Sequence, residues 1–303
     1  MNRNWRQLSL RSAVLLIVLL SLAGAIWNHF VSGFHRQSRV VAELRQLGVH
    51  LQLRSAIGPE WLRRAVGEKD FFDVVSIGNV RPHDGKLISA SVVLEKLHYV
   101  RILEQLWIRG PVSDADLRYI SHLKTLRRLF LIDSEISDQG LIHLKSLKNL
   151  RMLTLSGSRV SDEGLVQLDL SNLQEFVLAS PNVKGYGLRG LRDCASLTHL
   201  DFSSESATNE WLQEAGPPRS LLHVTLYRTN VDDRGAALLE NCPHLRSAWF
   251  LYSPIGETAL DRLICLKELE TVWNYGTNIS PAMLKQFNAT RRSMELKPVS
   301  LLE

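Results

Sequence analysis

Acidic side chains recur along this chain at related positions that could support acid–base chemistry, because two carboxylates held close together can act as general acid and base. Each of these acids, however, follows a polar corner and precedes leucines at helical spacing. It therefore falls in the first turn of a helix, where a carboxylate suits the helix dipole. The acids are Asp114, Asp138, Asp162 and Asp233. Their recurrence indicates architecture and not catalysis.

Other chemical groups are equally unspecific. The sequence has no G-x-S-x-G, no H-E-x-x-H, no P-loop and no glycine-rich turn after a strand. Cys242 and His244 lack the paired spacing of a zinc site. His199 and His223 occupy matching positions and could respond to pH as a pair, or could be ordinary solvated residues. We expect no enzymatic activity, no metal and no cofactor.

The elements that must position these residues are marked by a leucine that recurs every 23 or 24 residues. A unit this short cannot bury an apolar face alone, so the units must stack and share one core. The first leucines of the units are Leu103, Leu126, Leu150, Leu173, Leu197, Leu221, Leu245 and Leu269. The spacing predicts a solenoid.

The second unit shows the pattern inside a repeat. Leu126, Leu129 and Leu131 alternate as a short strand. Ser137 and Asp138 then follow where a helix N-cap and first turn belong. The pattern predicts an α/β solenoid with parallel strands on the concave face and helices on the convex face.

A six-residue tract supports a family resemblance. Val-Ser-Asp-Glu-Gly-Leu at 160–165 is echoed at 136–141, 112–117 and 231–236. With the leucine spacing, the chain resembles leucine-rich repeat proteins of the 24-residue, ribonuclease-inhibitor-like and cysteine-containing type, in particular bacterial membrane-anchored members. The resemblance implies a horseshoe that binds protein through its concave sheet.

The chain divides into five segments. They are an N-terminal basic stub at 1–11, a transmembrane signal anchor at 12–31, a connector and N-terminal cap at 32–71, repeats at 72–288, and a C-terminal cap or tail at 289–303. The repeats comprise eight clear units from residue 103 and one diverged unit before them. We expect Phe72, Val75 and Ile77 to form the strand of the diverged unit.

Both solenoid ends need caps, since an end repeat would otherwise expose its leucines. In the connector, apolar residues at helical spacing from Val40 to Leu47 predict a helix that ends at Gly48. A strand at 49–53 and a helix after Pro59 follow. At the other end, the residues expected to close the last coil are Met294, Leu296 and Val299.

Residues 12–31 are uncharged and reach the roughly 20 residues that a helix needs to cross a bilayer. The alternative is a cleaved secretory signal, because residues 23–25 fit a small-residue cleavage site after Ala25. Three arginines precede the span and two follow it, which favours an inside N-terminus. They are Arg3, Arg6 and Arg11, then Arg36 and Arg39. We predict a single-pass membrane protein with its repeats on the non-cytoplasmic side.

Two cysteines share one position in the repeat. Cys194 and Cys242 each follow the first leucine of their unit by 21 residues, so both should point into the core. They are two units apart, which separates stacked strands by roughly 10 Å. A disulfide rarely joins Cα atoms more than about 7 Å apart. We therefore expect buried free thiols.

Side chains alternate along a strand, so Phe130 points outward if Leu129 and Leu131 point inward. In every unit this register gives a central outward row: Trp107, Phe130, Thr154, Val177, Asp201, Thr225, Trp249 and Trp273. Flanking rows add Arg109, Ile132, His199, His223, Tyr227, Leu251 and Tyr275.

Aromatic residues are dense on this face, and exposed apolar patches with Trp, Tyr and Arg are typical of interaction sites. The predicted partner-binding residues are Trp107, Arg109, Phe130, Asp201, Tyr227, Trp249, Trp273 and Tyr275. The alternative is that the rings only stabilise the sheet through cross-strand pairs, with Trp249 and Trp273 contacting each other.

Composition agrees with a binding role but excludes one partner class. The net charge is +5, yet the basic residues are spread along the chain, so we expect no nucleic acid. The sequence predicts a membrane-anchored, non-enzymatic protein that binds another protein through its concave sheet. Alternatives are the substrate-recognition component of an enzyme complex, such as a ubiquitin-ligase-like effector, and a glycan-binding module.

Overall fold

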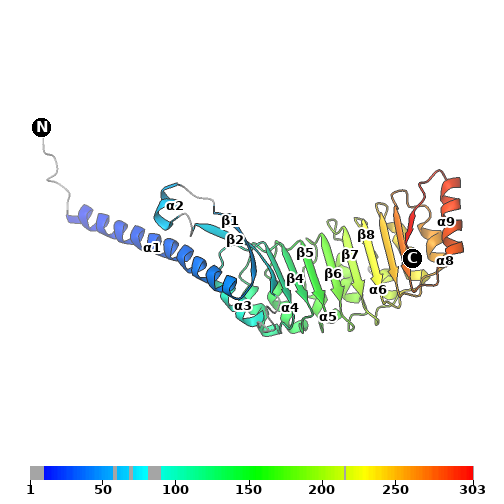
Figure 1. Cartoon of the computed structure of the whole chain (residues 1–303), viewed down its shortest axis with the longest axis horizontal. Helices are drawn as coiled ribbons and strands as arrows, with labels where there is room; N and C mark the ends of the chain where they lie inside the picture. The colour runs from blue at the N-terminus through cyan, green and yellow to red at the C-terminus, as the bar shows by residue number, and fades with distance from the viewer. Residues whose placement is uncertain (1–9, 57–59, 68–70, 81–89, 215, 303) are drawn as a thin grey trace.

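The computed structural model describes residues 10–56, 60–67, 71–80, 90–214 and 216–302. One long helix, α1 (Leu10–Gln46), projects from the end of a curved solenoid (Figure 1). In the described residues eleven strands form one sheet, and their spatial order follows the chain from β1 to β11. The short helices of the repeats cover one face of this sheet. The architecture is the predicted α/β leucine-rich repeat solenoid.

The strands of the eight clear repeats are five residues long and pair in parallel. The strands are β1 (His50–Ser55), β2 (Phe72–Val80), β3 (Gln105–Arg109), β4 (Arg128–Ile132), β5 (Met152–Ser156), β6 (Glu175–Ala179), β7 (His199–Ser203), β8 (His223–Tyr227), β9 (Ser247–Leu251), β10 (Thr271–Tyr275) and β11 (Ser300–Leu302). β1 is antiparallel to β2, whereas β10 and β11 continue the parallel arrangement.

The convex side carries short α-helical and 3-10 segments, whereas α2 belongs to the N-terminal cap. The α-helices are α2 (Glu60–Val66), α3 (Ala90–Lys96), α4 (Asp138–Leu144), α5 (Asp162–Val166), α6 (Glu210–Glu214), α7 (Asp233–Ala236), α8 (Glu257–Leu263) and α9 (Pro281–Ser293). The 3-10 helices are η1 (Leu97–Tyr99), η2 (Asp114–Ile120), η3 (Tyr186–Leu191) and η4 (Ala237–Asn241).

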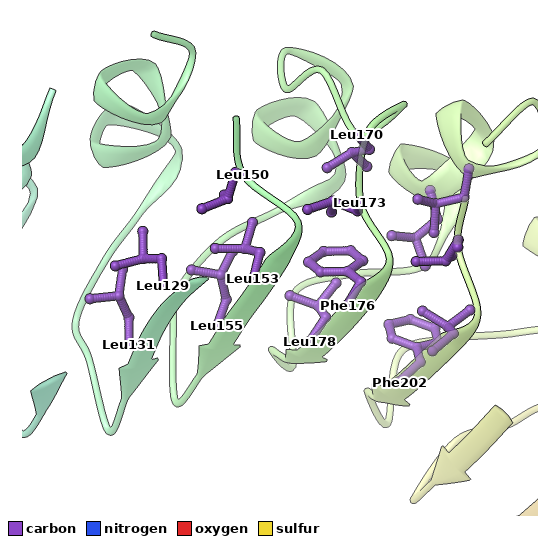
Figure 2. Close-up of a cluster of buried hydrophobic side chains, with 14 of the residues drawn as sticks. Leu129, Leu131, Leu150, Leu153, Leu155, Leu170, Leu173, Phe176, Leu178 and Phe202 are labelled. Carbon is purple, nitrogen blue, oxygen red and sulfur yellow. The ribbon is translucent and has the colours of Figure 1, made fainter. Parts of the chain in front are cut away.

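The leucine ladder forms the continuous core. Leu129 and Leu131 of β4 are fully buried, and the corresponding residues of β5 and β6 stack beside them (Figure 2). Phe176 and Phe202 take leucine positions in β6 and β7 and are equally buried. Burial of each such side chain contributes about 1.5–3 kcal/mol. The stacked side chains therefore hold each unit against its neighbours.

The repeated aspartates connect consecutive units. Asp138, the first residue of α4, accepts hydrogen bonds from the backbone N (2.8 Å) and the Oγ (2.6 Å) of Ser161 in the next unit. Asp114 makes the same two bonds to Ser137, at 2.8 and 2.6 Å. Each acid thus faces a helix N-terminus of its own unit and holds the N-cap serine of the following one.

Asp162 makes the most buried of these connections. It is 2% exposed and accepts backbone N–H groups from Lys184 (2.7 Å), Gly185 (2.9 Å) and Gly187 (2.7 Å). Asp162→Ala should lower the free energy of unfolding by about 3 kcal/mol, because these donors lose their acceptor. Denaturant unfolding measures the change. Asp193→Ala, at an exposed position, is the control, and equal losses in both variants would contradict this role.

The N-terminal cap is continuous with the apolar helix. The sequence predicts a span at 12–31 and a separate helix from Val40, but α1 is one helix of 37 residues through both. Val40, Val41 and Leu44 are buried against the first repeat. Gly48, with φ of 75°, ends the turn after the helix, as expected for a C-cap glycine.

The diverged first unit has its strand where the sequence predicts it, with an irregular register. Phe72, Val75 and Ile77 all lie in β2. Val74 and Ile77 are fully buried, whereas Val75 is half-buried. The pairing of β2 with β1 shifts at this point and skips Val75. An extra residue of this kind interrupts the alternation of a strand.

Helix α9 and the segment after it close the other end. Leu284 and Phe287 of α9 are buried, and so is Val299, just before β11. Met294 is 44% exposed, because it follows the last turn of α9 and points to solvent. The expectation that Met294 closes the last coil was wrong.

A buried arginine completes this cap. Arg291 of α9 has no exposed surface. Its guanidinium donates to the backbone oxygens of Lys297, Ile264 and Leu266, each at 2.9 Å, and of Leu269 at 3.2 Å. Burial lowers the pKa of Arg291 from its ordinary value. The cation lies near the C-terminus of α8, where helix carbonyls favour positive charge.

The cysteines follow the prediction. Cys194 and Cys242 are free and at most 1% exposed, whereas Cys265 is free and exposed. The thiol of Cys194 donates to the carbonyl oxygen of Ser171 in the preceding unit, at 3.2 Å. Burial raises the pKa of the Cys242 thiol to about 12. Both buried thiols are packing groups and not nucleophiles.

Candidate binding surface

The concave face presents the outward residues of each strand. Trp107 and Trp249 are 38% and 36% exposed, and Tyr275 is 52% exposed. The other predicted residues divide into two sets. Arg109 and Asp201 are exposed, whereas Phe130, Tyr227 and Trp273 are half-buried. The predicted phase of the strands is therefore the observed one.

Two of the predicted rings lie at the N-terminal end of the face. Trp107 and Phe130 are paired across β3 and β4, with ring centroids 5.3 Å apart. Beside them, the Nε of Arg109 lies 2.9 Å from the Oδ2 of Asp133. Both members of this ion pair are more than half exposed, so it adds little stability. We call Trp107 and Phe130 the N-terminal ring pair.

A larger group of rings lies at the C-terminal end. Trp249 of β9 and Trp273 of β10 are cross-strand neighbours in an edge arrangement, with centroids 4.9 Å apart. Tyr252 contacts Tyr275 at 5.2 Å and Tyr227 at 5.9 Å, both edge to face. We call these five residues the C-terminal aromatic patch. Edge-to-face contacts fix ring orientation in a way that isolated surface rings lack.

A cationic side chain, Arg228, lies at the border of the patch. The guanidinium of Arg228 lies 5.4 Å from the centre of the Tyr227 ring and 5.7 Å from that of Tyr252. Cation–π contacts of this kind are favourable at exposed sites. Arg228 therefore adds a positive charge at the border of an aromatic surface.

The backbone of the patch is strained at two positions. The residue directly after a strand has a left-handed backbone in six units, and three of those residues are glycines, among them Gly157 and Gly276. At the same position Arg228 and Tyr252 have φ of 50° and 52°. A bulky residue is unfavourable there, and strain of this kind concentrates at functional sites. Sheet propensity does not account for it, since neither residue is in a strand.

The middle of the face is polar. Asp201 pairs in register with Thr225, which in turn pairs with Trp249. Asp201 is thus two strands, roughly 10 Å, from Trp249. Thr154, predicted to point outward, is only 7% exposed. The structure separates the predicted residues into two aromatic ends and a polar centre.

The two histidines of the face are stacked. The rings of His199 and His223 are 4.3 Å apart and nearly parallel, at 20°. Burial lowers the pKa of His223, and the neighbouring His199 lowers it further. Protonation of His223 is therefore less favourable in the folded protein than in the unfolded chain.

This shift makes stability depend on pH. Because the folded state binds fewer protons at His223, the free energy of unfolding should rise with pH through this range. We expect the free energy of unfolding to fall as the pH drops below 6.5, the ordinary pKa of histidine, toward the lower pKa that His223 has in the folded protein. His223→Gln should lose less stability over the same interval in denaturant titrations. An equal loss in the two proteins would show that this histidine is not responsible.

Tyr252 of the patch and Arg228 at its border were not predicted from the sequence. Strand alternation does not reach them, because each follows the last residue of its strand. A signal was present, since other units carry Gly110, Gly157 and Gly276 at the same place. Backbone preference alone would not select a large side chain where other units have glycine. A comparison of the units could therefore have singled out both residues.

The repeated acids outside this face hold neighbouring units together. In the part of the chain that the structure describes, no three His, Cys, Asp or Glu side chains are close enough to hold a metal ion. The repeated acids are occupied by backbone donors, and Asp233 accepts the N–H of Gly256 in the same way. What the arrangement offers is a broad aromatic surface for contact.

Comparison with known proteins adds distant likenesses. No protein family and no curated protein matches the chain. The structure of internalin C2 of Listeria monocytogenes is similar to this one over 69% of this chain and 83% of the internalin chain, at 22% sequence identity and a TM-score of 0.48. A second internalin of that organism, inlF, is 17% identical over 76% of this chain and 66% of its own, with a TM-score of 0.44. At this distance, function has to be argued from the residues of this chain.

Proposed function

We propose that this leucine-rich repeat solenoid is a non-enzymatic recognition module that α1 anchors in a membrane. Its concave face binds another protein outside the cytoplasm. The observation that carries the proposal is the C-terminal aromatic patch, with Arg228 at its border. Tryptophan, tyrosine and arginine gathered in one place are the residues that most often dominate binding free energy in protein interfaces.

Stabilisation of the sheet is a weaker explanation for the patch. It accounts for the contact of Trp249 with Trp273, since aromatic residues suit cross-strand pairs. It does not account for Tyr252, which follows a strand, has a left-handed backbone and is still 47% exposed. Such a residue costs about 1–3 kcal/mol in backbone strain. A contact made with a partner explains why an aromatic side chain stands there.

The border of the patch indicates the chemistry of the partner. Arg228 remains on the surface beside Tyr227 and Tyr252, where its charge is stabilised by the rings. A carboxylate of a partner could form a charge-assisted hydrogen bond with this guanidinium. The surface therefore fits a protein with an apolar segment next to an acidic side chain.

Helix α1 supports the anchor. It holds a stretch long and apolar enough to cross a membrane. Val14, Leu15 and Leu16 point to three different sides of the helix and are 54%, 63% and 50% exposed, so no part of the described structure covers them. Exposed apolar side chains on every side of a helix are typical of a segment that lies in lipid. The arginines before the span favour a non-cytoplasmic location for the repeats.

Proximity labelling in the source cells tests the binding proposal. A labelling enzyme fused to the C-terminus would be compared in the wild type, Tyr252→Asn and Tyr99→Asn. The last is a matched control, because Tyr99 has the same 47% exposure but lies in η1, away from the patch. We expect specific proteins to be lost with Tyr252→Asn and kept with Tyr99→Asn. The same proteins in all three samples would refute binding through the patch.

Tyr252→Asn should leave the fold intact. Asparagine tolerates the left-handed backbone, so relief of strain offsets the lost ring contacts. We expect the free energy of unfolding to change by less than about 1 kcal/mol. Urea unfolding measures it. A loss of several kcal/mol would mean that Tyr252 is a structural residue, and the labelling result would then need another explanation.

A further inference from the structure

Helix α2 packs beside the apolar helix at one end of its uncharged stretch. The rings of Trp61 in α2 and Trp27 in α1 are stacked, with centroids 5.4 Å apart and planes at 22°. Leu62 and Val66 of α2 are buried in a small cluster that includes Phe34 of α1. Because Trp27 precedes Phe34 in α1, Trp61 contacts α1 nearer to its N-terminal, apolar part than Leu62 and Val66 do. Figure 1 shows α2 next to α1 at this end of the molecule.

Trp61 is unusual for a residue of a packed cap. It is 60% exposed although Leu62 beside it is buried. Arg63 and Arg64 of the same helix are also exposed. An exposed indole next to two arginines is the combination found where a protein contacts the boundary of a bilayer.

The position along α1 agrees with that boundary. Trp27 follows Arg11 by 16 residues, which is about 24 Å of helix. The hydrocarbon core is about 30 Å thick, so a helix that enters at Arg11 has about 6 Å left to cross at Trp27. This places the Trp27 ring just inside the opposite interface, where aromatic side chains gather. The stacked ring of Trp61 is then at the same depth.

The joint between α1 and the solenoid is fixed by buried contacts. Gln37 of α1 has no exposed surface, and its Nε2 donates to the carbonyl oxygen of Phe72 at 2.5 Å. Its Oε1 accepts the backbone N–H of Arg101 at 3.0 Å. The guanidinium of Arg101 lies 4.1 Å from the ring centre of Phe34. These bonds tie the helix directly to the first strand of the repeats.

We infer that the cap rests on the membrane that α1 crosses, with Trp61 and the exposed side of α2 in the headgroup layer. This inference rests on the proposed membrane anchor. The helix and the cap together hold the solenoid at one angle to the bilayer instead of letting it swing. Arg64 pairs with Glu60, and Arg63 leaves α2 with a net positive charge, which favours a leaflet that contains anionic phospholipid. The partner surface is thereby presented in a fixed direction.

Photo-crosslinking of the full chain tests this. The protein would be reconstituted in vesicles of phosphatidylcholine and phosphatidylglycerol, with p-benzoylphenylalanine in place of Trp27, Trp61 or Trp249 in turn. Trp249, on the concave face, is the control. After irradiation, mass spectrometry would identify lipid adducts. We expect adducts at 27 and 61 in yields within about threefold of each other, since both rings lie at the interface. We expect none at 249.

Each other outcome is decisive. Lipid adducts at 27 alone would overturn membrane contact by the cap and leave the anchor standing. Absence of adducts at both 27 and 61 would refute the anchor and the inference together. Protein adducts at 61, or lipid adducts in equal yield at 61 and 249, would also overturn contact of α2 with the headgroup layer.

Discussion

Replacement of both Trp249 and Trp273 by alanine is expected to weaken binding of the protein partner at least about 100-fold. Each ring should contribute about 2 kcal/mol or more as an interface anchor, and each 1.4 kcal/mol corresponds to a factor of ten in affinity. The two rings contact each other at 4.9 Å, so their effects will not add fully. The dissociation constant of purified wild type and variant for a captured partner measures the change.

The N-terminal ring pair provides the matched control for this prediction. Trp107 and Phe130 are also cross-strand neighbours, with centroids 5.3 Å apart. Their double replacement removes the same kind of contact from the other end of the face. If it weakens binding as much as loss of Trp249 and Trp273, binding is not centred on the C-terminal patch. If the Trp249 and Trp273 variant keeps its affinity within about threefold, neither ring is an anchor.

Arg291→Met is expected to lower the free energy of unfolding by about 3–5 kcal/mol. The methionine retains much of the volume but leaves the backbone oxygens that the guanidinium held without a donor. Two of these, the carbonyls of Leu266 and Leu269, are buried. Breaking a buried, hydrogen-bonded charge network by removing one member typically costs this much. The effect should be largest at the C-terminal units, because a solenoid loses its ends first when a cap fails.

Denaturant unfolding and native-state hydrogen exchange measure this. Arg292→Met is the matched control, because Arg292 is exposed on the same helix and should change stability by less than about 0.5 kcal/mol. In Arg291→Met, the amides of β10 and β9 should exchange faster than those of β4. Equal stability of the two variants, or uniform loss of protection along the solenoid, would contradict the role of Arg291 as the cap.

The sequence predicts the repeats well because their signals are local. Leucine alternation in Leu129 and Leu131 fixes which side of the strand faces the core, and this also fixes the outward direction of Trp107 and Trp249. The spacing of 23 or 24 residues then places rings of successive units next to each other. Fold class and the direction of the aromatic rows follow from these two periods alone.

The features missed depend on contacts between distant residues or on backbone shape. Nothing near Arg291 in the sequence indicates carbonyl oxygens from the preceding unit, so its burial could not be predicted. Tyr252 lies outside the strand and became part of the patch through a left-handed turn. The shift in pairing between β1 and β2 at Val75 could not be predicted either, because alternation assumes an uninterrupted strand.

The positions of the repeated aspartates were predicted from the sequence, but one of their two roles was not. Their first-turn positions are as predicted, at the first residue of α4 for Asp138 and of α5 for Asp162. Their second role, as acceptors for the next unit, needs the three-dimensional stacking and is not contained in the helix-dipole argument. The sequence therefore identified these residues as architectural without identifying what they bind.

Hydroxyl-radical footprinting of the purified complex tests the binding surface most directly, because it reports solvent access to individual side chains. We predict that oxidation of Trp249, Tyr252 and Tyr275 falls at least about threefold when the partner is bound, as expected for anchors from which water is excluded. Tyr99 and Trp61 should be unchanged in the same samples. Unchanged oxidation of the patch, with protection elsewhere on the solenoid, would contradict recognition through the C-terminal aromatic patch.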